Sequence, residues 1–225
     1  MPEDYYINKL YPFQNHIMKI ISQCETSFYL TGGTALSRFY LNHRYSDDLD
    51  FFENGEVQFK RHTEIIEKKL SEAKIETGIL NRSENFIRFK CKKDELEIKI
   101  DLVNDIPYRT GKTEVFPEYP EIDNWKNILT NKITAISRLE PKDIADILFI
   151  CRRFTFKWEE ILEEASKKVN YIDALEISTI LTEFPSEYLE KIKWTEKINI
   201  EKAAQDIRRI AKNILLKEDN ISHQL

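Results

Sequence analysis

The spacing of hydrophobic residues in the first half of the chain predicts short strands alternating with helices. Ile98, Ile100 and Leu102 fall on every second position, as in a strand, whereas the apolar residues of 10–24 recur at helical spacing. Residues 92–95 separate two strand patterns and predict a hairpin turn. The patterns together predict helices over residues 10–24, 34–41 and 57–73 and strands over residues 27–30, 49–52, 75–80, 86–91 and 96–103.

The pattern changes after residue 103. A loop-rich connection follows, marked by Pro107, Gly111, Pro117 and Pro120. Beyond it, helices are predicted over residues 125–138, 141–153, 158–169, 173–182, 186–192 and 198–216. We therefore expect an α+β protein, in which a mixed-sheet α/β domain over residues 1–120 precedes a helical domain over residues 121–225.

Composition narrows the classes of protein to which this sequence can belong. Of its 225 residues, 41% are hydrophobic, which is enough for a folded core. The 34 Lys and Arg residues and 39 Asp and Glu residues give a net charge of -5 at pH 7, which argues against a surface that binds nucleic acid throughout. A local basic groove is compatible with this charge, and its candidate residues are 60–61, 90–93 and 208–209.

Cysteine spacing and the lack of apolar targeting segments indicate the compartment. Cys24, Cys91 and Cys151 are far apart and form no metal-binding pair, so neither a disulfide framework nor a structural zinc site is expected. The first residues lack an apolar signal-peptide core, and no apolar run is long enough to span a membrane. We expect a cytoplasmic protein with no membrane partner.

The segment FYLTGGTAL, at residues 28–36, places two of the five glycines side by side between a predicted strand and a predicted helix. Glycine permits close backbone approach, and the free N–H groups of a first helical turn attract anions. Gly32, Gly33 and Thr34 are therefore candidates for binding phosphate. The segment is equally compatible with an ordinary strand-to-helix turn, and it is not a Walker P-loop because no GKS or GKT follows.

The segment RYSDDLDFF, at residues 44–52, contains two aspartates on one predicted strand face. Alternate strand residues share a face, so Asp48 and Asp50 project together while Leu49 and Phe51 point the other way. Two adjacent carboxylates repel each other unless a cation lies between them, and such oxygen ligands suit Mg²⁺ or Mn²⁺. A solvated acidic strand end is the alternative, which the apolar neighbours disfavour.

A third aspartate, Asp101, lies near the end of the apolar strand predicted over residues 96–103. An unpaired charge at this position would be costly, and sharing a metal ion with Asp48 and Asp50 would remove that cost. Glu97 lies on the same strand face and competes for this role. An ion pair between Asp101 and a lysine is the structural alternative.

The order of these features resembles that of the polymerase β-type nucleotidyltransferase superfamily. In more detail, GGTALSRFYL followed by RYSDDLDFF resembles the AbiEii/AbiGii toxin family, whose members typically carry GGTAL, R-x-S-x-D-x-D, a later helical lysine and an R-D-x-x-D-like segment. Residues 44–50 match the second motif, Lys132 stands at the place of the lysine, and residues 141–146 resemble the last motif, with Lys142 where arginine is usual. The resemblance covers roughly residues 28–150.

This resemblance implies a metal-dependent nucleotidyltransferase that transfers NMP from an NTP to an acceptor, with Mg²⁺ or Mn²⁺ as cofactor. It implies that Asp48, Asp50 and Asp101 hold the metal, and that the helical domain completes the active-site cleft. It also implies that Lys132 contacts the triphosphate, and that Asp143 orients this lysine or acts on the acceptor. From the residues alone, Lys132 could instead extend its ammonium group to solvent, and Asp143 could simply stabilise the first turn of a helix.

Arg38, one helical turn after the glycines, is a further candidate that would contact phosphate or brace Asp48. The family is associated with bacterial toxin–antitoxin and phage-defence systems, which implies a toxin, a cognate antitoxin and an acceptor such as tRNA or another RNA. A small-molecule acceptor, such as an antibiotic, is the alternative within enzymes, and the acidic net charge is compatible with it. A catalytically silent module that binds a nucleotide or a partner is the alternative from another class, and the intact aspartates argue against it.

Overall fold

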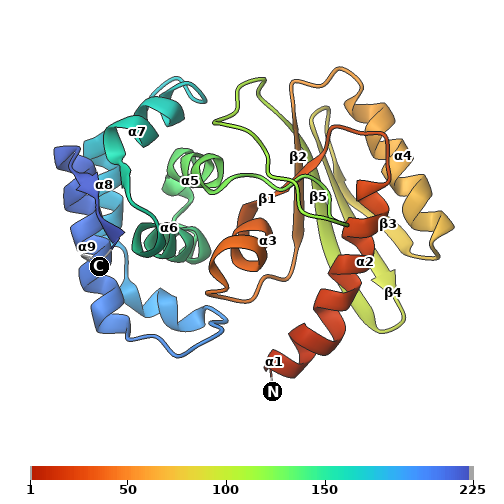
Figure 1. Ribbon diagram of the computed structural model, residues 1–225, viewed down its shortest axis with the longest axis horizontal. Helices are drawn as coiled ribbons and strands as arrows, with labels where there is room; N and C mark the ends of the chain where they lie inside the picture. Colours follow the sequence, from red (N-terminus) through yellow and green to blue (C-terminus); the bar gives the residue numbers. More distant parts are fainter. Residues whose placement is uncertain (1, 223–225) are drawn as a thin grey trace. The chain divides into compact units, whose positions relative to one another are not determined.

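The computed structural model describes residues 2–222, which divide into two units (Figure 1). The first unit contains residues 2–35 and Ser46–Asn124, and the second contains Leu36–Tyr45 and residues 125–222. The second unit therefore includes Leu36–Tyr45, a segment that lies within the first 120 residues of the sequence.

The first unit is built on a five-stranded mixed sheet, as the sequence predicts. Its strands are β1 (Tyr29–Thr31), β2 (Leu49–Asn54), β3 (Glu76–Arg82), β4 (Phe86–Lys93) and β5 (Leu96–Asp105). They lie in the order β1-β2-β5-β4-β3; β2 and β5 are parallel, and the other neighbouring pairs are antiparallel. The β4–β5 hairpin turns at Asp94, whose φ of 55° lies in the left-handed region, within the predicted turn.

One face of this sheet belongs to the hydrophobic core of the first unit. Side chains of alternate residues are buried on it: Leu49, Phe51, Ile87, Phe89, Ile98, Ile100 and Leu102. Helices α2 (Tyr11–Ser22) and α4 (Phe59–Glu72) lie beside each other in this unit and bury the apolar stripes that their sequence spacing predicts (Figure 1). Because strand side chains alternate, Asp50 and Asp101 fall on the opposite face of the sheet, where they are partly exposed.

The second unit is mainly helical. Its helices are η2 (Leu36–Leu41), α5 (Trp125–Thr134), η3 (Ile136–Arg138), α6 (Pro141–Arg153), α7 (Trp158–Ser166), α8 (Ala174–Glu183), η4 (Ser186–Lys191) and α9 (Ile200–Leu216). Local sequence explains several helix starts. Pro141 opens α6, where its missing N–H costs nothing, and the Asn199 side chain caps α9 by accepting a hydrogen bond from the Lys202 amide at 2.9 Å.

Several parts of the fold differ from the sequence prediction. The helical N-terminus starts earlier than residue 10, as α1 (Pro2–Tyr5) and η1 (Tyr6–Leu10), because Tyr6 and Leu10 continue the buried face of α2. A second, two-stranded sheet pairs β6 (Phe156–Lys157) with β7 (Asp219–Asn220), and strands this short leave no periodic signal. The helix predicted from residue 34 starts as α3 (Gly32–Ala35) and continues with π-helical geometry as η2.

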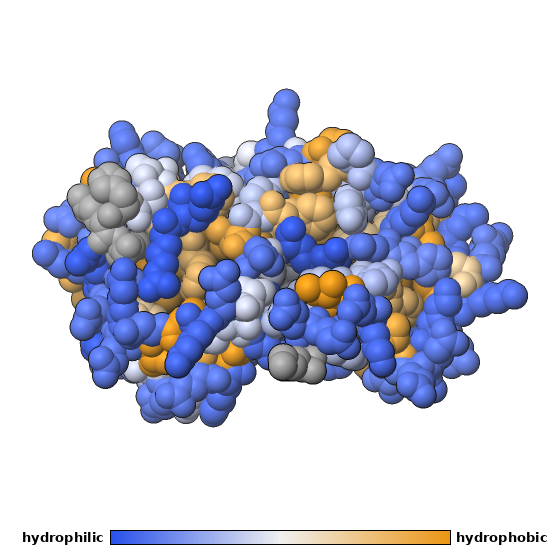
Figure 2. Space-filling view, turned by 60° about the horizontal axis from the view of Figure 1, so that its bottom comes forward, coloured by the Kyte–Doolittle hydropathy of each residue, from blue (hydrophilic) through white to orange (hydrophobic). Residues whose placement is uncertain are grey.

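Hydrophilic side chains cover most of the face of the molecule in Figure 2, and hydrophobic residues show in patches between them. Residues 2–222 contain no helix that is both long enough and apolar enough to cross a membrane.

Candidate active site

Parallel pairing of β2 with β5 brings two of the predicted metal ligands together. Asp50 on β2 is the direct partner of Asp101 on β5, and on its other side Asp50 is the partner of Thr31 on β1. Asp48 directly precedes Leu49, the first residue of β2. The charges of Asp48, Asp50 and Asp101 all act on the same side chain, that of Arg88 on β4. Three carboxylates therefore gather at one place on the sheet.

Gly32 has a steric reason to be glycine. Its φ of 67° lies in the left-handed region, and a Cβ atom built on it would collide with the carboxylate of Asp50, lying 3.2 Å from Cγ. The Gly-Gly pair thus gives the Asp50 carboxylate its place beside the start of α3. This close approach is one reason for the glycine at position 32. It applies independently of phosphate binding.

Replacing Gly32 by alanine should therefore disturb both stability and the position of Asp50. A left-handed non-glycine residue costs about 1–2 kcal/mol, and the added methyl group must also push the Asp50 carboxylate aside. Urea unfolding should show this loss of stability, and metal binding should weaken with it. Gly78→Ala is the matched control because a Cβ at Gly78 meets no atom within 4 Å. Equal stability of the two variants would contradict this role for Gly32.

The Thr34 hydroxyl holds the backbone of the aspartate motif. It is fully buried, donates a hydrogen bond to the Asp48 carbonyl and lies 2.8 Å from the Ser46 hydroxyl. The buried Gln14 amide supports the same segment by donating to the carbonyls of Ser46, at 3.0 Å, and Asp47, at 3.2 Å. This geometry does not support phosphate binding by the Thr34 hydroxyl. It also explains the serine of the R-x-S-x-D-x-D motif, whose role the sequence interpretation missed.

Arg88 on β4 is an unpredicted member of this cluster. Its Nε and Nη2 atoms donate to the two carboxylate oxygens of Asp101, at 2.7 and 2.6 Å. This bidentate pair is an ion pair of the kind considered as the alternative for Asp101, with an arginine in place of the expected lysine. The competing carboxylate, Glu97, instead forms an ion pair with Lys90 at 2.7 Å. Neither pairing could be read from one strand, because both depend on the β4–β5 register.

Within residues 2–222 no group of three or more His, Cys, Asp or Glu side chains is already arranged to hold a metal ion. The chemistry of the donors nevertheless fits a hard divalent cation, because it consists of carboxylate oxygens on adjacent strands. The hydrogen bond to Asp101 raises the pKa of Arg88, and the charges of Asp101, Asp48 and Asp50 add to this effect against burial. The cationic Arg88 side chain thus offsets the negative charge of all three carboxylates. A bound Mg²⁺ or Mn²⁺ would neutralise the same charge.

Removing the Arg88 side chain is expected to strengthen metal binding. Arg88→Ala frees Asp101 from a competing cation, so the affinity for Mn²⁺ should rise by about tenfold, the value of one charge-assisted hydrogen bond. Calorimetric titration of Mn²⁺ without nucleotide measures this directly. Lys90→Ala removes a comparable cross-strand pair, with Glu97, and should leave Mn²⁺ affinity unchanged. A weaker affinity in Arg88→Ala would instead show that Arg88 organises the carboxylates.

In the second unit, Asp146 on α6 is the centre of a buried charge cluster. Arg44 donates to both of its carboxylate oxygens, from Nε at 2.7 Å and from Nη2 at 2.8 Å. Lys132 Nζ on α5 lies 2.6 Å from Oδ2, and His43 Nε2 lies 2.7 Å from Oδ1. Burial alone would raise the pKa of Asp146, but the charges of Arg44 and Lys132 and the hydrogen bonds hold it well below its usual range.

Lys132 and Asp143 are brought together as the resemblance implies. Lys132 is only 7% exposed, and its ammonium group donates to Asp143 Oδ1 at 2.6 Å as well as contacting Asp146. The ammonium group therefore does not extend to solvent, which was the alternative interpretation of this lysine. Burial would lower the pKa of Lys132, but Asp146 and Asp143 raise it, so the side chain is cationic. Arg38, the remaining candidate of this unit, is partly buried on η2.

Two residues of the charge cluster were missed although their sequence signal was present. Asp146 is a charged residue among buried neighbours on α6, which calls for a buried partner. Arg44 opens the R-x-S-x-D-x-D motif, and its burial on Asp146 gives that arginine a structural role. The motif is thus shared by the two units: Arg44 belongs to the second, and Ser46 with the aspartates belongs to the first.

Comparison with solved structures places the fold among known ones. The protein JHP933 from Helicobacter pylori is 18% identical, with a TM-score of 0.62 over 93% of this chain and 92% of that chain. A candidate nucleotidyltransferase from H. pylori is also 18% identical, with a TM-score of 0.63 over 93% of this chain and 95% of its own. At this identity the likeness concerns the fold. No match was found among curated protein sequences.

The family comparison covers nearly the whole chain. The model for the nucleotidyl transferase AbiEii toxin of type IV toxin–antitoxin systems matches residues 17–223. This confirms the resemblance on which the sequence interpretation rests and extends it beyond residue 150. The chain belongs to the AbiEii family of nucleotidyltransferase toxins.

Proposed function

We propose that this protein transfers a nucleoside monophosphate from an NTP to the hydroxyl group of an RNA acceptor, such as tRNA, in the presence of Mg²⁺ or Mn²⁺. The observation that carries the proposal is the register that sets Asp50 beside Asp101, with Asp48 directly before the strand that carries Asp50. An acidic cluster of this kind on a nucleotidyltransferase fold suits metal-assisted nucleotidyl transfer.

In this reaction the acceptor oxygen forms a bond to the α-phosphorus, the bond from that phosphorus to the bridging oxygen breaks, and pyrophosphate leaves. The metal ions, when bound, neutralise the charge of the triphosphate and of the attacking and leaving oxygens. Asp48 and Asp50 would hold them, and Asp101, once released by Arg88, would complete the ligand set and accept the proton of the acceptor hydroxyl.

The other candidate residues would position the triphosphate. The backbone N–H groups of Gly33 and Thr34 are the phosphate donors in this proposal, since the Thr34 hydroxyl is occupied. Lys132 would contact the triphosphate, with Asp143 orienting its ammonium group. Arg38 is a further phosphate ligand in this scheme. The helical domain thereby contributes to catalysis through residues 132 and 143.

The proposed biological setting is a toxin controlled by a cognate antitoxin protein, acting in the cytoplasm and in defence against phage. The toxin–antitoxin character is that of the family. An antitoxin that acts by blocking this site would be expected to lower nucleotidyl transfer when added to the purified toxin.

The test is transfer of label from each of the four NTPs, radioactive at the α-phosphorus, to total bacterial tRNA with Mg²⁺ or Mn²⁺. Wild-type protein is compared with Asp48→Ala and with protein in excess chelator. Label on RNA from wild type alone would support the proposal and identify the nucleotide. Metal-dependent NTP binding without labelled RNA would contradict the RNA acceptor and favour a small-molecule acceptor. If no NTP binds with either metal, the enzyme proposal is wrong.

A further inference from the structure

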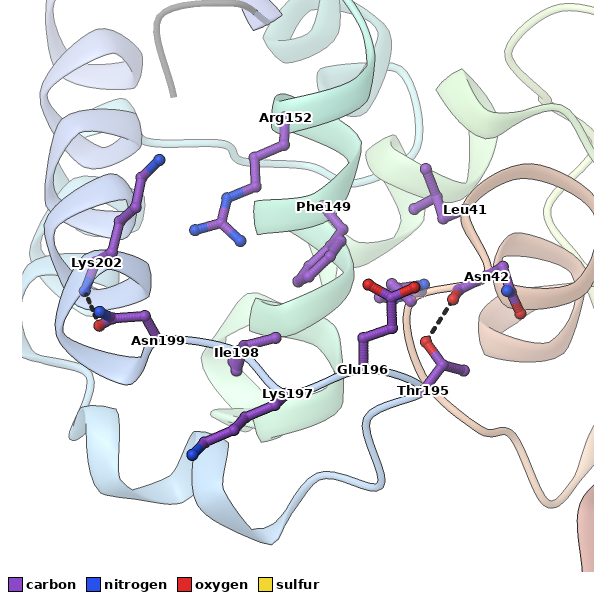
Figure 3. A pocket seen from close by; sticks show the side chains of 11 residues that line it. Leu41, Asn42, Phe149, Arg152, Thr195, Glu196, Lys197, Ile198, Asn199 and Lys202 are labelled. Atoms are coloured by element: carbon purple, nitrogen blue, oxygen red, sulfur yellow. Dashed lines mark hydrogen bonds between the residues drawn. The ribbon is translucent and has the colours of Figure 1, made fainter. Parts of the chain in front are cut away.

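A pocket of about 510 Å³ lies within the second unit, outside the residues assigned to nucleotidyl transfer. Its wall is formed by α6, the residues after η2 and the loop that leads into α9 (Figure 3). The lining residues used below are Arg152, Glu196, Asn199 and Lys202. The volume falls within the range of pockets that bind small molecules, roughly 300–1,000 Å³.

One end of this pocket is cationic. Arg152 on α6 and Lys202 on α9 both line it, and Figure 3 shows both side chains away from Glu196. Asp206 accepts hydrogen bonds from Arg152 Nε, at 3.1 Å, and Nη2, at 2.6 Å, which fixes the guanidinium plane. Among residues 2–222, no ion pair is formed by the Lys202 ammonium. An anion entering this end would therefore meet an oriented guanidinium group and a lysine with no carboxylate partner.

The first turn of α9 adds to this preference for an anion. The Asn199 side chain caps α9 by accepting a hydrogen bond from the Lys202 amide. Both residues line the pocket, so the N-terminus of this 17-residue helix lies at the pocket wall. The partial positive charge of a helix N-terminus favours phosphate.

The other end of the pocket offers a hydrogen-bond acceptor. Glu196 lies near Asn42 and Thr195, as Figure 3 shows, and presents a carboxylate that can accept hydrogen bonds from neutral donors.

We propose that this pocket binds a ribose 5′-phosphate unit, with the phosphate at Arg152 and Lys202 and a ribose hydroxyl group donating to Glu196. A ligand with an anion at one end and neutral donors at the other satisfies both ends of the pocket. Such a unit is carried by a free mononucleotide and by the 5′ end of an RNA strand. The residues that line the pocket do not include Asp48, Asp50 or Asp101, so this proposal does not depend on the proposed reaction.

The experiment is calorimetric titration in excess chelator, on a background of Asp48→Ala, so that triphosphate chemistry plays no part. The probes are AMP, dAMP and a short oligoribonucleotide with or without a 5′-phosphate. Lys202→Glu should weaken AMP binding by about tenfold or more, since it replaces a phosphate ligand by a like charge. The matched control is Lys212→Glu, which makes the same charge change at an exposed position on the same helix.

The site is supported if AMP or the 5′-phosphorylated oligonucleotide binds, and if Lys202→Glu weakens this binding while Lys212→Glu preserves it. Whichever of the two probes binds more tightly shows whether the ligand is a free mononucleotide or the 5′ end of an RNA strand. Weaker binding of dAMP than of AMP supports the assignment of a ribose hydroxyl group to Glu196. Equal binding of these two nucleotides overturns that assignment. Equal loss in the two lysine variants, or no binding of any probe by the protein with Lys202 intact, overturns the site. None of these outcomes bears on nucleotidyl transfer.

Discussion

Replacing Asp50 by asparagine is expected to lower the rate of nucleotidyl transfer by about 10³-fold, close to complete loss in a label-transfer assay. Asp50 is the central carboxylate of the cluster because its neighbours are Thr31 on one strand and Asp101 on the other. Asparagine keeps the size of the side chain and its fit against Gly32, so the fold should persist. What is lost is the negative charge that a divalent cation requires.

The matched control for this change is Asp47→Asn, in the same acidic motif. The Asp47 carboxylate accepts a hydrogen bond from the Tyr6 hydroxyl, and an asparagine oxygen can accept the same bond. Transfer by Asp47→Asn should therefore stay near the wild-type rate. If Asp50→Asn retained full activity while thermal unfolding and circular dichroism matched wild type, Asp50 would not be a metal ligand. Equal loss in both variants would point to a general effect of charge on this segment.

The cluster was predictable because Asp50 and Asp101 lie in strands with a clear alternation and Asp48 directly precedes β2. Leu49 and Phe51 point into the core, so Asp50 must point away from it, and the same logic places Asp101 opposite Ile100 and Leu102. The motif order that identifies the family lies in one continuous stretch of sequence. Local periodicity and motif spacing therefore sufficed for the sheet, most helices and the acidic residues.

The pairings across elements could not be predicted in the same way. Arg88 meets Asp101 only because β4 and β5 pair in one register, and a strand's own alternation does not reveal its partner's register. Leu36–Tyr45 joins the helical unit because His43 and Arg44 are buried against Asp146, about a hundred residues later in the chain. In the sequence, such long-range ion pairs are visible only as charged residues among apolar neighbours. This pattern predicts that each has a buried partner but does not identify the partner.

The second large effect is expected at Asp146, in stability rather than in catalysis. Asp146→Asn leaves Arg44 and Lys132 buried with no carboxylate at the centre of the cluster, and loss of one partner from a buried ion pair costs about 3–5 kcal/mol. Urea unfolding at neutral pH should show this loss of free energy. Asp143→Asn is the control. Asp143 is partly exposed and, of the cations in the cluster, contacts only Lys132, so this change should lower the free energy of unfolding by clearly less.

The pH dependence separates charge from packing at this position. The pKa of Asp146 in the folded protein is held well below its usual value of 3.8. Its charge therefore stabilises the folded state fully at pH values above the pKa of this carboxyl in the unfolded chain, and the contribution is lost as the pH falls through the folded-state pKa. The difference in stability between wild type and Asp146→Asn should accordingly be constant at neutral pH and shrink below about pH 4. A difference that stayed the same in acid would mean that asparagine fails for its shape and hydrogen bonds, and that the charge of Asp146 contributes little to the fold.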